Sequence, residues 1–192
     1  MTVTNGYCTR QEIASKLGIE DTEDDAIIDA VINAVSRNID AYCSGRTFYA
    51  RTETRLFDVP YGRELVLDDD LLTVTTLTNG DSTVLTTTDY YLWPRNVSPK
   101  HKIILKESSS YVWTFDSSGN TEGAISVVGT WGWASSAPAD VAEACRIQTM
   151  RIFKRKDAPF GVMGSASMGQ LRMIAELDPD VKMMLNAYRK KT

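Results

Sequence analysis

The sequence has few of the residues that carry out chemistry or cross-link a fold. It contains one histidine, His101, and three cysteines, Cys8, Cys43 and Cys145. The cysteines are far apart, odd in number and include no CxxC pair. This pattern argues against a disulfide framework or a zinc site, and it favours a reducing compartment.

Long apolar runs are also missing. No uninterrupted stretch approaches the roughly 20 apolar residues that a membrane-spanning helix needs, so we expect no membrane partner. The N-terminal stretch MTVTNGYCTR has neither the basic start nor the apolar segment of a signal peptide. The net charge of −4 provides no overall attraction to nucleic acid, so any contact with DNA has to be local or non-adhesive.

The composition is otherwise that of a globular protein. The chain has 192 residues, of which 43% are apolar and 24% are charged. This length allows one domain, or one domain that carries an insertion, and it is sufficient for a sizeable core.

The first part of the chain is typical of amphipathic helix. A capping box, Thr9–Glu12, starts a short helix over Arg10–Leu17. Apolar residues at steps of three and four then predict a longer helix over Thr22–Ser44, which Asp21 or Thr22 can cap.

The last part of the chain is also helical. Pro138 is suited to the first position of a helix, and an apolar stripe runs on from it through Val141 and Cys145 to Ile152. A final helix starts at Asp178-Pro179, with Asp178 as its cap.

Between these helices the sequence favours β structure. Asn79-Gly80 predicts a tight hairpin, and Asp116–Asn120 predicts a turn between the strands YVWTF and AISVVG. The run Asp68–Asp70 is interpreted as an acidic turn between ELVL and LLTV. Short strands at this spacing suggest a small sandwich or a partly open barrel. The other predicted strands are Thr52–Val59, Glu64–Leu67, Tyr90–Trp93 and Lys102–Lys106.

These patterns predict an α+β protein. Neither helical end is long enough to bury its apolar stripe alone, so we expect the two ends to pack together as a helical bundle with an inserted small antiparallel β domain. The predicted boundaries are residues 1–45 plus 137–192 for the discontinuous helical domain and 46–136 for the insertion.

The sequence contains few residues that could form a catalytic site. His101 lies between Lys100 and Lys102 without a nearby nucleophile or orienting partner, so we interpret it as a solvated strand residue. No nucleotide, hydrolase or metalloprotease motif is present. We therefore expect neither enzymatic activity nor a cofactor.

The one dense acidic cluster consists of Asp68, Asp69 and Asp70, with Glu64 close by. Clustered carboxylates suit calcium or magnesium, but the spacing and glycine of an EF-hand loop are absent, so an acidic turn is favoured over a metal site. Pairing Glu64 or Asp68 with Trp93 as a glycosidase site is an alternative, although the sequence cannot set the distance between two carboxylates.

Aromatic residues gather in the β part. At alternating spacing they are typical of one face of a β core, although a stacking platform for bases or sugars is the alternative. The set is Tyr90, Tyr91, Trp93, Tyr111, Trp113, Trp131 and Trp133. The basic clusters 154–156 and 189–191 lie at helix C-termini, where the helix dipole accounts for them without DNA.

The segment Ala158–Leu171, APFGVMGSASMGQL, is too apolar for a solvated linker and too rich in glycine and serine for a core element. Five of the seven methionines lie between positions 163 and 184. Methionine adapts to a partner's surface, and glycine keeps a backbone mobile until it docks. We therefore expect this region to contact another protein.

The order of these elements resembles the head–tail connector proteins, also called head-completion or neck adaptor proteins, of tailed bacteriophages. The resemblance covers Tyr7–Phe48 and Ala124–Arg189. It rests on a short capped helix, a long helix ending in YCSGRTF, a strand AISVVGTWGWASSAP that enters the helix ADVAEACRIQTMRIFKRKD, and a terminal helix ending AYRKK. The β middle is larger than in the smallest members.

This resemblance implies a non-enzymatic structural protein of the virion neck that assembles in the host cytoplasm. Such proteins form a ring, typically a dodecamer, beneath the portal protein. The ring extends the channel through which DNA passes without sequence-specific binding, and it offers a docking surface for stopper and tail proteins.

In this family the C-terminal helix and the nearby loop reach toward the portal, which corresponds here to Asp178–Arg189 and Phe160–Gln170. The candidate partner-contact residues are Phe160, Val162, Met163, Met168, Leu171, Met184, Tyr188 and Arg189. For Met184 a place in the core is an equal alternative.

Two other functions stay open at this point. One is a different neck or tail structural protein, such as a stopper or a tail terminator. The other is a carbohydrate- or ligand-binding module formed by the aromatic residues of the β part.

Overall fold

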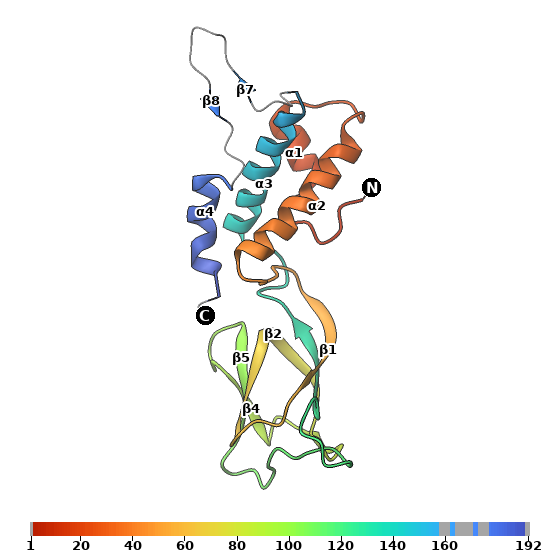
Figure 1. Ribbon diagram of the computed structural model, residues 1–192, viewed down its shortest axis with the longest axis vertical. Helices are drawn as coiled ribbons and strands as arrows, with labels where there is room; N and C mark the ends of the chain where they lie inside the picture. Colours follow the sequence, from red (N-terminus) through yellow and green to blue (C-terminus); the bar gives the residue numbers. More distant parts are fainter. Residues whose placement is uncertain (1, 158–161, 164–170, 173–176, 191–192) are drawn as a thin grey trace. The chain divides into compact units, whose positions relative to one another are not determined.

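The computed structural model describes residues 2–157, 162–163, 171–172 and 177–190. The chain divides into two compact units, one formed by Met1–Arg46 with Ala137–Thr192 and the other by Thr47–Ser136. The helices belong to the first unit and an antiparallel sheet to the second, so the fold is a mixed α+β one (Figure 1). No helix in the described part of the chain is both long and apolar enough to cross a bilayer.

The helical unit contains α1 (Arg10–Leu17), α2 (Asp25–Tyr42), α3 (Ala139–Phe153) and α4 (Pro179–Leu185), which is followed by the 3-10 turn η2 (Asn186–Tyr188). Helix α3 packs against α1, α2 and α4 (Figure 1). Their shared core is aliphatic, and its fully buried members are Ile13, Ile28, Ile32, Val35, Ile39, Val141, Ala144, Cys145, Val181 and Leu185.

Helix α1 begins and ends where its sequence predicts. Thr9 Oγ1 accepts a hydrogen bond from the Glu12 amide, and the Glu12 carboxylate accepts one from the Thr9 amide at 2.7 Å. Gly18 closes the helix with a left-handed φ of 69°. The bond from the Thr9 amide is the largest cause of the lowered pKa of Glu12, so the cap favours the charged carboxylate.

Helix α2 is shorter than the predicted Thr22–Ser44. Its N-cap is Asp24, whose side chain makes no capping bond, so the prediction that Asp21 or Thr22 caps the helix is wrong. Asp21 instead accepts from the Glu23 amide at 3.1 Å, which closes a local turn before the helix begins. Helix α3 likewise starts one residue after Pro138, which is its N-cap.

The β unit contains one sheet with the strand order β1-β6-β2-β5-β4, with β3 pairing to β2. All described pairings in it are antiparallel. The strands form one sheet, so of the two predicted arrangements, a small sandwich or a partly open barrel, the sandwich is wrong. The strands are β1 (Arg51–Phe57), β2 (Glu64–Thr78), β3 (Val84–Leu85), β4 (Tyr90–Trp93), β5 (Lys100–Leu105) and β6 (Ile125–Trp131).

The structure contradicts the predicted acidic turn at Asp68–Asp70. These residues are part of one long strand, β2, and only its register with β5 shifts there, between Val66 and Leu71. A bulge of this kind disrupts the ladder locally and redirects side chains.

The hairpin between β2 and β3 exists, but its turn is not the predicted two-residue one. The loop runs from Asn79 to Thr83, closed by the Asn79 amide on the Thr83 carbonyl at 2.8 Å. The Asn79 side chain instead bonds the backbone of Val112 and Thr114, at 2.9 and 3.1 Å. The residues YVWTF, predicted as a strand, form this irregular segment beside the hairpin.

The core of the β unit lies on one face of the sheet. Aromatic residues contribute to it as predicted for Tyr90, Trp113 and Trp131, whereas Trp93 and Tyr111 are exposed. The buried cluster is Leu65, Leu67, Leu71, Leu77, Leu85, Tyr90, Ile103, Leu105, Trp113, Ile125, Val127 and Trp131.

Candidate functional site

The predicted partner-contact residues fall into two groups. Phe160 and Met168 lie outside the described residues. Val162–Met163 and Leu171–Arg172 form the short strands β7 and β8, which pair with each other in an antiparallel manner. The backbone therefore brings positions 162, 163 and 171 together, with Met163 opposite Leu171.

The remaining predicted residues lie on α4 and η2. Met184 is half-buried, and Met183 is the exposed methionine, with 69% of its surface accessible. The buried residues Val181 and Leu185 lie four apart, so position 183 is on the opposite side of the helix. Met183 is one of the five methionines of the predicted contact region but was not among the candidate partner-contact residues, although the spacing of Val181 and Leu185 indicates its exposed position.

Tyr188 fixes the end of the chain to the helical unit. Its hydroxyl donates to the Asp140 carboxylate at 2.7 Å, and its carbonyl accepts from Arg46. Burial, followed by the hydrogen bond to Asp140, raises the pKa of Tyr188 to about 12. This predicted contact residue thus has an internal role, because it attaches the last turn to the N-terminus of α3.

Arg189 is exposed and stacks on Tyr42, with its Cζ atom 5.3 Å from the ring centroid. The Tyr42 hydroxyl bonds Asn186 at 2.7 Å. At the other end of α4, Asp178 caps the helix and forms an ion pair with Arg151 of α3, and its backbone amide donates to Gln148 Oε1 at 3.1 Å. Helix α4 is therefore held at both ends, with Met183 exposed on it and Arg189 exposed just after η2.

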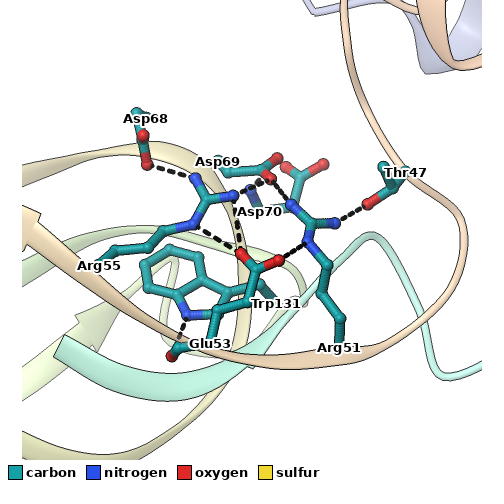
Figure 2. A network of polar contacts seen from close by, with 8 residues as sticks. All are labelled: Thr47, Arg51, Glu53, Arg55, Asp68, Asp69, Asp70 and Trp131. Atoms are coloured by element: carbon teal, nitrogen blue, oxygen red, sulfur yellow. Dashed lines mark hydrogen bonds and ion pairs between the residues drawn. The ribbon is translucent and has the colours of Figure 1, made fainter.

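Two carboxylates of the acidic cluster, Asp68 and Asp69, pair with two arginines (Figure 2). Asp69 accepts from Arg51 at 2.6 Å and from Arg55 at 3.0 Å, and Asp68 pairs with Arg55 at 2.8 Å. Burial works to lower the pKa of Arg51, but the hydrogen bonds and charges of Asp69 and Glu53 together outweigh it, so the pKa is raised. Two of the carboxylates considered for a metal ion, Asp68 and Asp69, thus have guanidinium partners.

This Arg–Asp network joins two strands that are not neighbours. Arg51, Glu53 and Arg55 alternate along β1, whereas Asp68 and Asp69 belong to β2, and β6 lies between these strands. The Arg55 guanidinium covers the Trp131 ring of β6 at 4.7 Å, and the Trp131 indole donates to the Glu53 carbonyl at 3.2 Å (Figure 2). The network therefore bridges β1 and β2 across the central tryptophan.

A second surface of the β unit lies on the outer face of β4, β5 and β2. The strand register places Trp93 beside Lys102, and Lys102 beside Val66. Trp93 is 48% exposed, and Lys102 pairs with Glu64 at 2.7 Å. A depression of about 270 Å³ on this face is lined by Glu64, Tyr91, Trp93, Lys102 and Ile104. We call these five residues the aromatic face.

The other residues considered for chemistry do not converge. Glu64 lies near Trp93, but its carboxylate is held by Lys102, and Asp68 is held by Arg55 instead of facing Glu64. His101 is exposed, with its Nδ1 atom 3.6 Å from Asp70. Within the described residues, no three side chains capable of binding a metal ion gather at one place.

Chains with a similar fold occur in solved structures of a gene transfer agent (GTA) particle. The neck of an empty GTA particle with C6 symmetry matches with a TM-score of 0.64 and 16% identity, over 100% of this chain and 94% of that one. The neck of a native GTA particle with C12 symmetry matches with a TM-score of 0.63 and 17% identity, over 100% and 93%.

A third match is a chain from the virion of a native gene transfer agent particle, with a TM-score of 0.61 and 15% identity over 100% of this chain and 94% of that one. At this identity the likeness shows the fold, and it extends over both the helical and the β unit because the whole chain is covered. No protein-family profile and no curated protein sequence matches this chain.

Proposed function

We propose that this protein is a head–tail connector, or adaptor, of a phage-like particle. One observation carries the proposal. A fold with two units of different class is matched over its whole length by chains from the neck of a gene transfer agent particle. The match covers the helical elements that resemble connector proteins, and it also covers the β insertion that the smallest connectors lack.

The proposed assembly is a ring of twelve copies at the portal vertex. The neck structures have C6 and C12 symmetry. A ring needs a heterologous contact, in which two different surfaces of the subunit meet and the rotation closes. The ring extends the DNA channel, and the net charge of −4 suits a wall along which DNA moves without being held.

We place the portal contact on the C-terminal segment. Helix α4 presents Met183 beside the half-buried Met184, Arg189 is exposed just after η2, and the strands β7 and β8 bring Met163 opposite Leu171. Tyr188 contributes by fixing the segment to α3. Phe160, Val162 and Met168 complete the proposed contact. Stopper and tail proteins dock elsewhere on the ring.

The test measures assembly with and without the portal protein of the same particle. Native mass spectrometry of the mixture is expected to give a complex with many copies of this chain, and deletion of residues 160–170 is expected to abolish it. Met183→Glu should weaken it, while Val84→Glu, at an exposed apolar site of the β unit, is the matched control. A protein that stays monomeric and ignores the portal in every condition contradicts the proposal.

The same deletion separates the adaptor from the other neck proteins. A stopper or tail terminator would also self-assemble, but it docks on the tail side. Portal binding that survives deletion of residues 160–170 would therefore favour this second type of neck protein.

The aromatic face supports one different function, the binding of a carbohydrate. An exposed tryptophan stacks on sugar rings, and the Glu64–Lys102 pair beside Trp93 offers hydrogen-bonding groups to hydroxyls. Tryptophan fluorescence titrated with a glycan panel tests this function, with Trp93→Ala as the control. Quenching that Trp93→Ala removes would support it, and an unchanged spectrum with all glycans would exclude it.

A further inference from the structure

The residues before α1 form a strap along α2. We define the strap as residues 2–8. Asn33 Oδ1 accepts from the Thr4 amide at 2.9 Å, and Ser36 Oγ accepts from the Tyr7 amide at 3.1 Å. The side chains that form hydrogen bonds with the strap lie on successive turns of one face of α2. They are those of Asn33, Ser36, Arg37 and Asp40.

A glycine allows the strap to lie close to the helix. A Cβ atom added to Gly6 would lie 2.9 Å from Ile32 Cγ2 of α2 and 2.4 Å from Val3 Cγ1. Such distances are too short for carbon atoms in contact. The strap therefore has a defined path, and this path delivers Cys8 to a fixed position at its end.

At that position Cys8 meets Cys145 of α3. The two sulfur atoms are 3.3 Å apart, although the residues are 137 positions apart in the chain. Both side chains are buried, and Ser36 Oγ lies 3.6 Å from Cys145 Sγ. A disulfide bond is about 2.05 Å long, so bond formation needs an approach of only about 1.3 Å. The third thiol, Cys43, is also buried and lies near the Leu185 carbonyl, at 4.0 Å.

The chemistry of the pair favours oxidation. The hydrogen bond from Cys8 lowers the pKa of Cys145, and the same bond raises the pKa of Cys8. Cys145 is therefore the thiol of the pair that more readily becomes a thiolate, and the thiolate is the nucleophile in thiol oxidation. Burial raises the pKa of Cys43 to about 11, so this thiol is much less reactive.

A pocket brings a small oxidant to Cys8, which is in contact with the fully buried Cys145. A pocket of about 710 Å³ in the helical unit is bordered by the strap and the start of α1, and Cys8 is part of its wall. Arg10, Asp25 and Asp29 form its polar side. A molecule of the size of hydrogen peroxide enters a pocket of this volume.

We infer that Cys8 and Cys145 form an intramolecular disulfide when the protein meets a peroxide. The thiolate attacks one peroxide oxygen, the O–O bond breaks, and hydroxide leaves with the electron pair, which yields a sulfenic acid. The neighbouring thiol then attacks that sulfur, the S–O bond breaks, and the thiol proton leaves with the hydroxyl group as water. One peroxide is thus reduced and two thiols are oxidised.

The bond would lock the strap onto α3. It closes a loop that contains the whole β unit, and long loops gain the most from a cross-link in the chain-entropy description. Its purpose, stabilising a neck that has left the reducing cytoplasm, rests on the proposed function. The cross-link itself is a property of the single chain and needs no ring.

The experiment treats the full-length reduced protein with hydrogen peroxide and counts thiols by alkylation and mass spectrometry. Free thiols are expected to fall from three to one, with a peptide linking Cys8 to Cys145. The melting temperature should rise by about 5–15 °C and return to its initial value after reduction.

The variants use the third cysteine as the matched control. Cys43→Ser should keep both the cross-link and the rise in melting temperature, whereas Cys8→Ser and Cys145→Ser should lose both. Cys145→Ser puts a hydroxyl group at a fully buried position and can prevent folding. The peptide map of the unsubstituted protein therefore decides on its own whether Cys8 and Cys145 are cross-linked.

Three free thiols after treatment, a disulfide that includes Cys43, or a disulfide between two chains would each overturn the inference. None of these outcomes affects the connector proposal, which portal binding alone decides. Conversely, failure to bind portal leaves the cross-link assay unchanged.

Discussion

At the scale of single residues, Asp69 is a buried carboxylate that pairs with two arginines of the β unit. Its side chain is 7% exposed and accepts from both Arg51 and Arg55. Asp69→Asn removes the charge beside two partly buried guanidinium groups, of which that of Arg55 lies over Trp131. We expect a loss of about 2 kcal/mol in the free energy of unfolding, below the full cost of breaking a buried pair because the arginines retain access to water.

The control is the neighbouring residue. Asp68 is 66% exposed and pairs with Arg55, so Asp68→Asn should cost about 0.5 kcal/mol or less. Urea denaturation followed by tryptophan fluorescence measures both variants. Equal losses at the two positions would mean that burial does not distinguish these ion pairs.

Tyr188 makes the attachment of η2 sensitive to high pH. Its pKa is raised from 10.0 to about 12, so the folded state holds the proton more tightly than the unfolded chain. The stabilisation is complete below pH 10 and is lost as the pH rises toward 12. Tyr188→Phe removes the bond to Asp140 and should cost about 1 kcal/mol at neutral pH.

The measurement is the difference in melting temperature between the unsubstituted protein and Tyr188→Phe, followed from neutral to alkaline pH. The difference should be constant up to pH 10 and shrink above it. Tyr61→Phe is the control, because the Tyr61 side chain is fully exposed. A difference that grows above pH 10 would contradict the assigned direction of the pKa shift.

At the scale of elements, the sequence predicted best what is encoded locally. The capping box and Gly18 define the two ends of α1 by local contacts, and the predicted and observed bounds agree. Strand β4 also has its predicted bounds. For β2 the local signal was misleading, because three consecutive aspartates suggest a turn. The arginines that pair with Asp68 and Asp69 lie on β1, 13 and 18 positions away.

The contacts between segments far apart in the chain could not be predicted from the sequence. The spacing of three cysteines gave no indication that Cys8 and Cys145 meet, because the meeting depends on the strap lying along α2. The same applies to Tyr188, whose partner Asp140 starts another helix. The exposed Met183, in contrast, follows from helical periodicity once Val181 and Leu185 are recognised as core.

A substitution at Gly80 tests whether the loop between β2 and β3 packs against residues 112–115. A Cβ atom at this position would lie 2.1 Å from the Thr114 carbonyl oxygen and 2.6 Å from the Phe115 carbonyl carbon. Both contacts are backbone atoms, so Gly80→Ala has to move the segment that Asn79 holds. We expect a loss of about 2–4 kcal/mol in the free energy of unfolding.

Gly62→Ala is the matched control for Gly80→Ala. Gly62 has a left-handed φ of 80° and nothing within 4 Å of an added Cβ, so its substitution should cost only about 1 kcal/mol of backbone strain. Urea denaturation compares the two. A cost at Gly80 no larger than at Gly62 would show that the hairpin loop is not packed against residues 112–115.

At the scale of the whole molecule, two units of different class have separate cores in one chain. The helical core is aliphatic and includes Ile32, while the β core includes Leu71 beside Trp131. The four tryptophans all lie between residues 93 and 133, within the β unit. Tryptophan fluorescence therefore reports on the β unit, and circular dichroism at the helical band reports mainly on the other unit.

This separation predicts that core substitutions act on one probe at a time. Leu71→Ala and Ile32→Ala each remove a fully buried side chain and should cost about 2–5 kcal/mol. Leu71→Ala should lower the urea midpoint of the fluorescence transition and leave the dichroism transition near its original midpoint, and Ile32→Ala should do the reverse. If each substitution moved both transitions equally, the units would unfold as one cooperative body, and the β insertion would then contribute to the stability of the helical unit from which the connector ring is proposed to form.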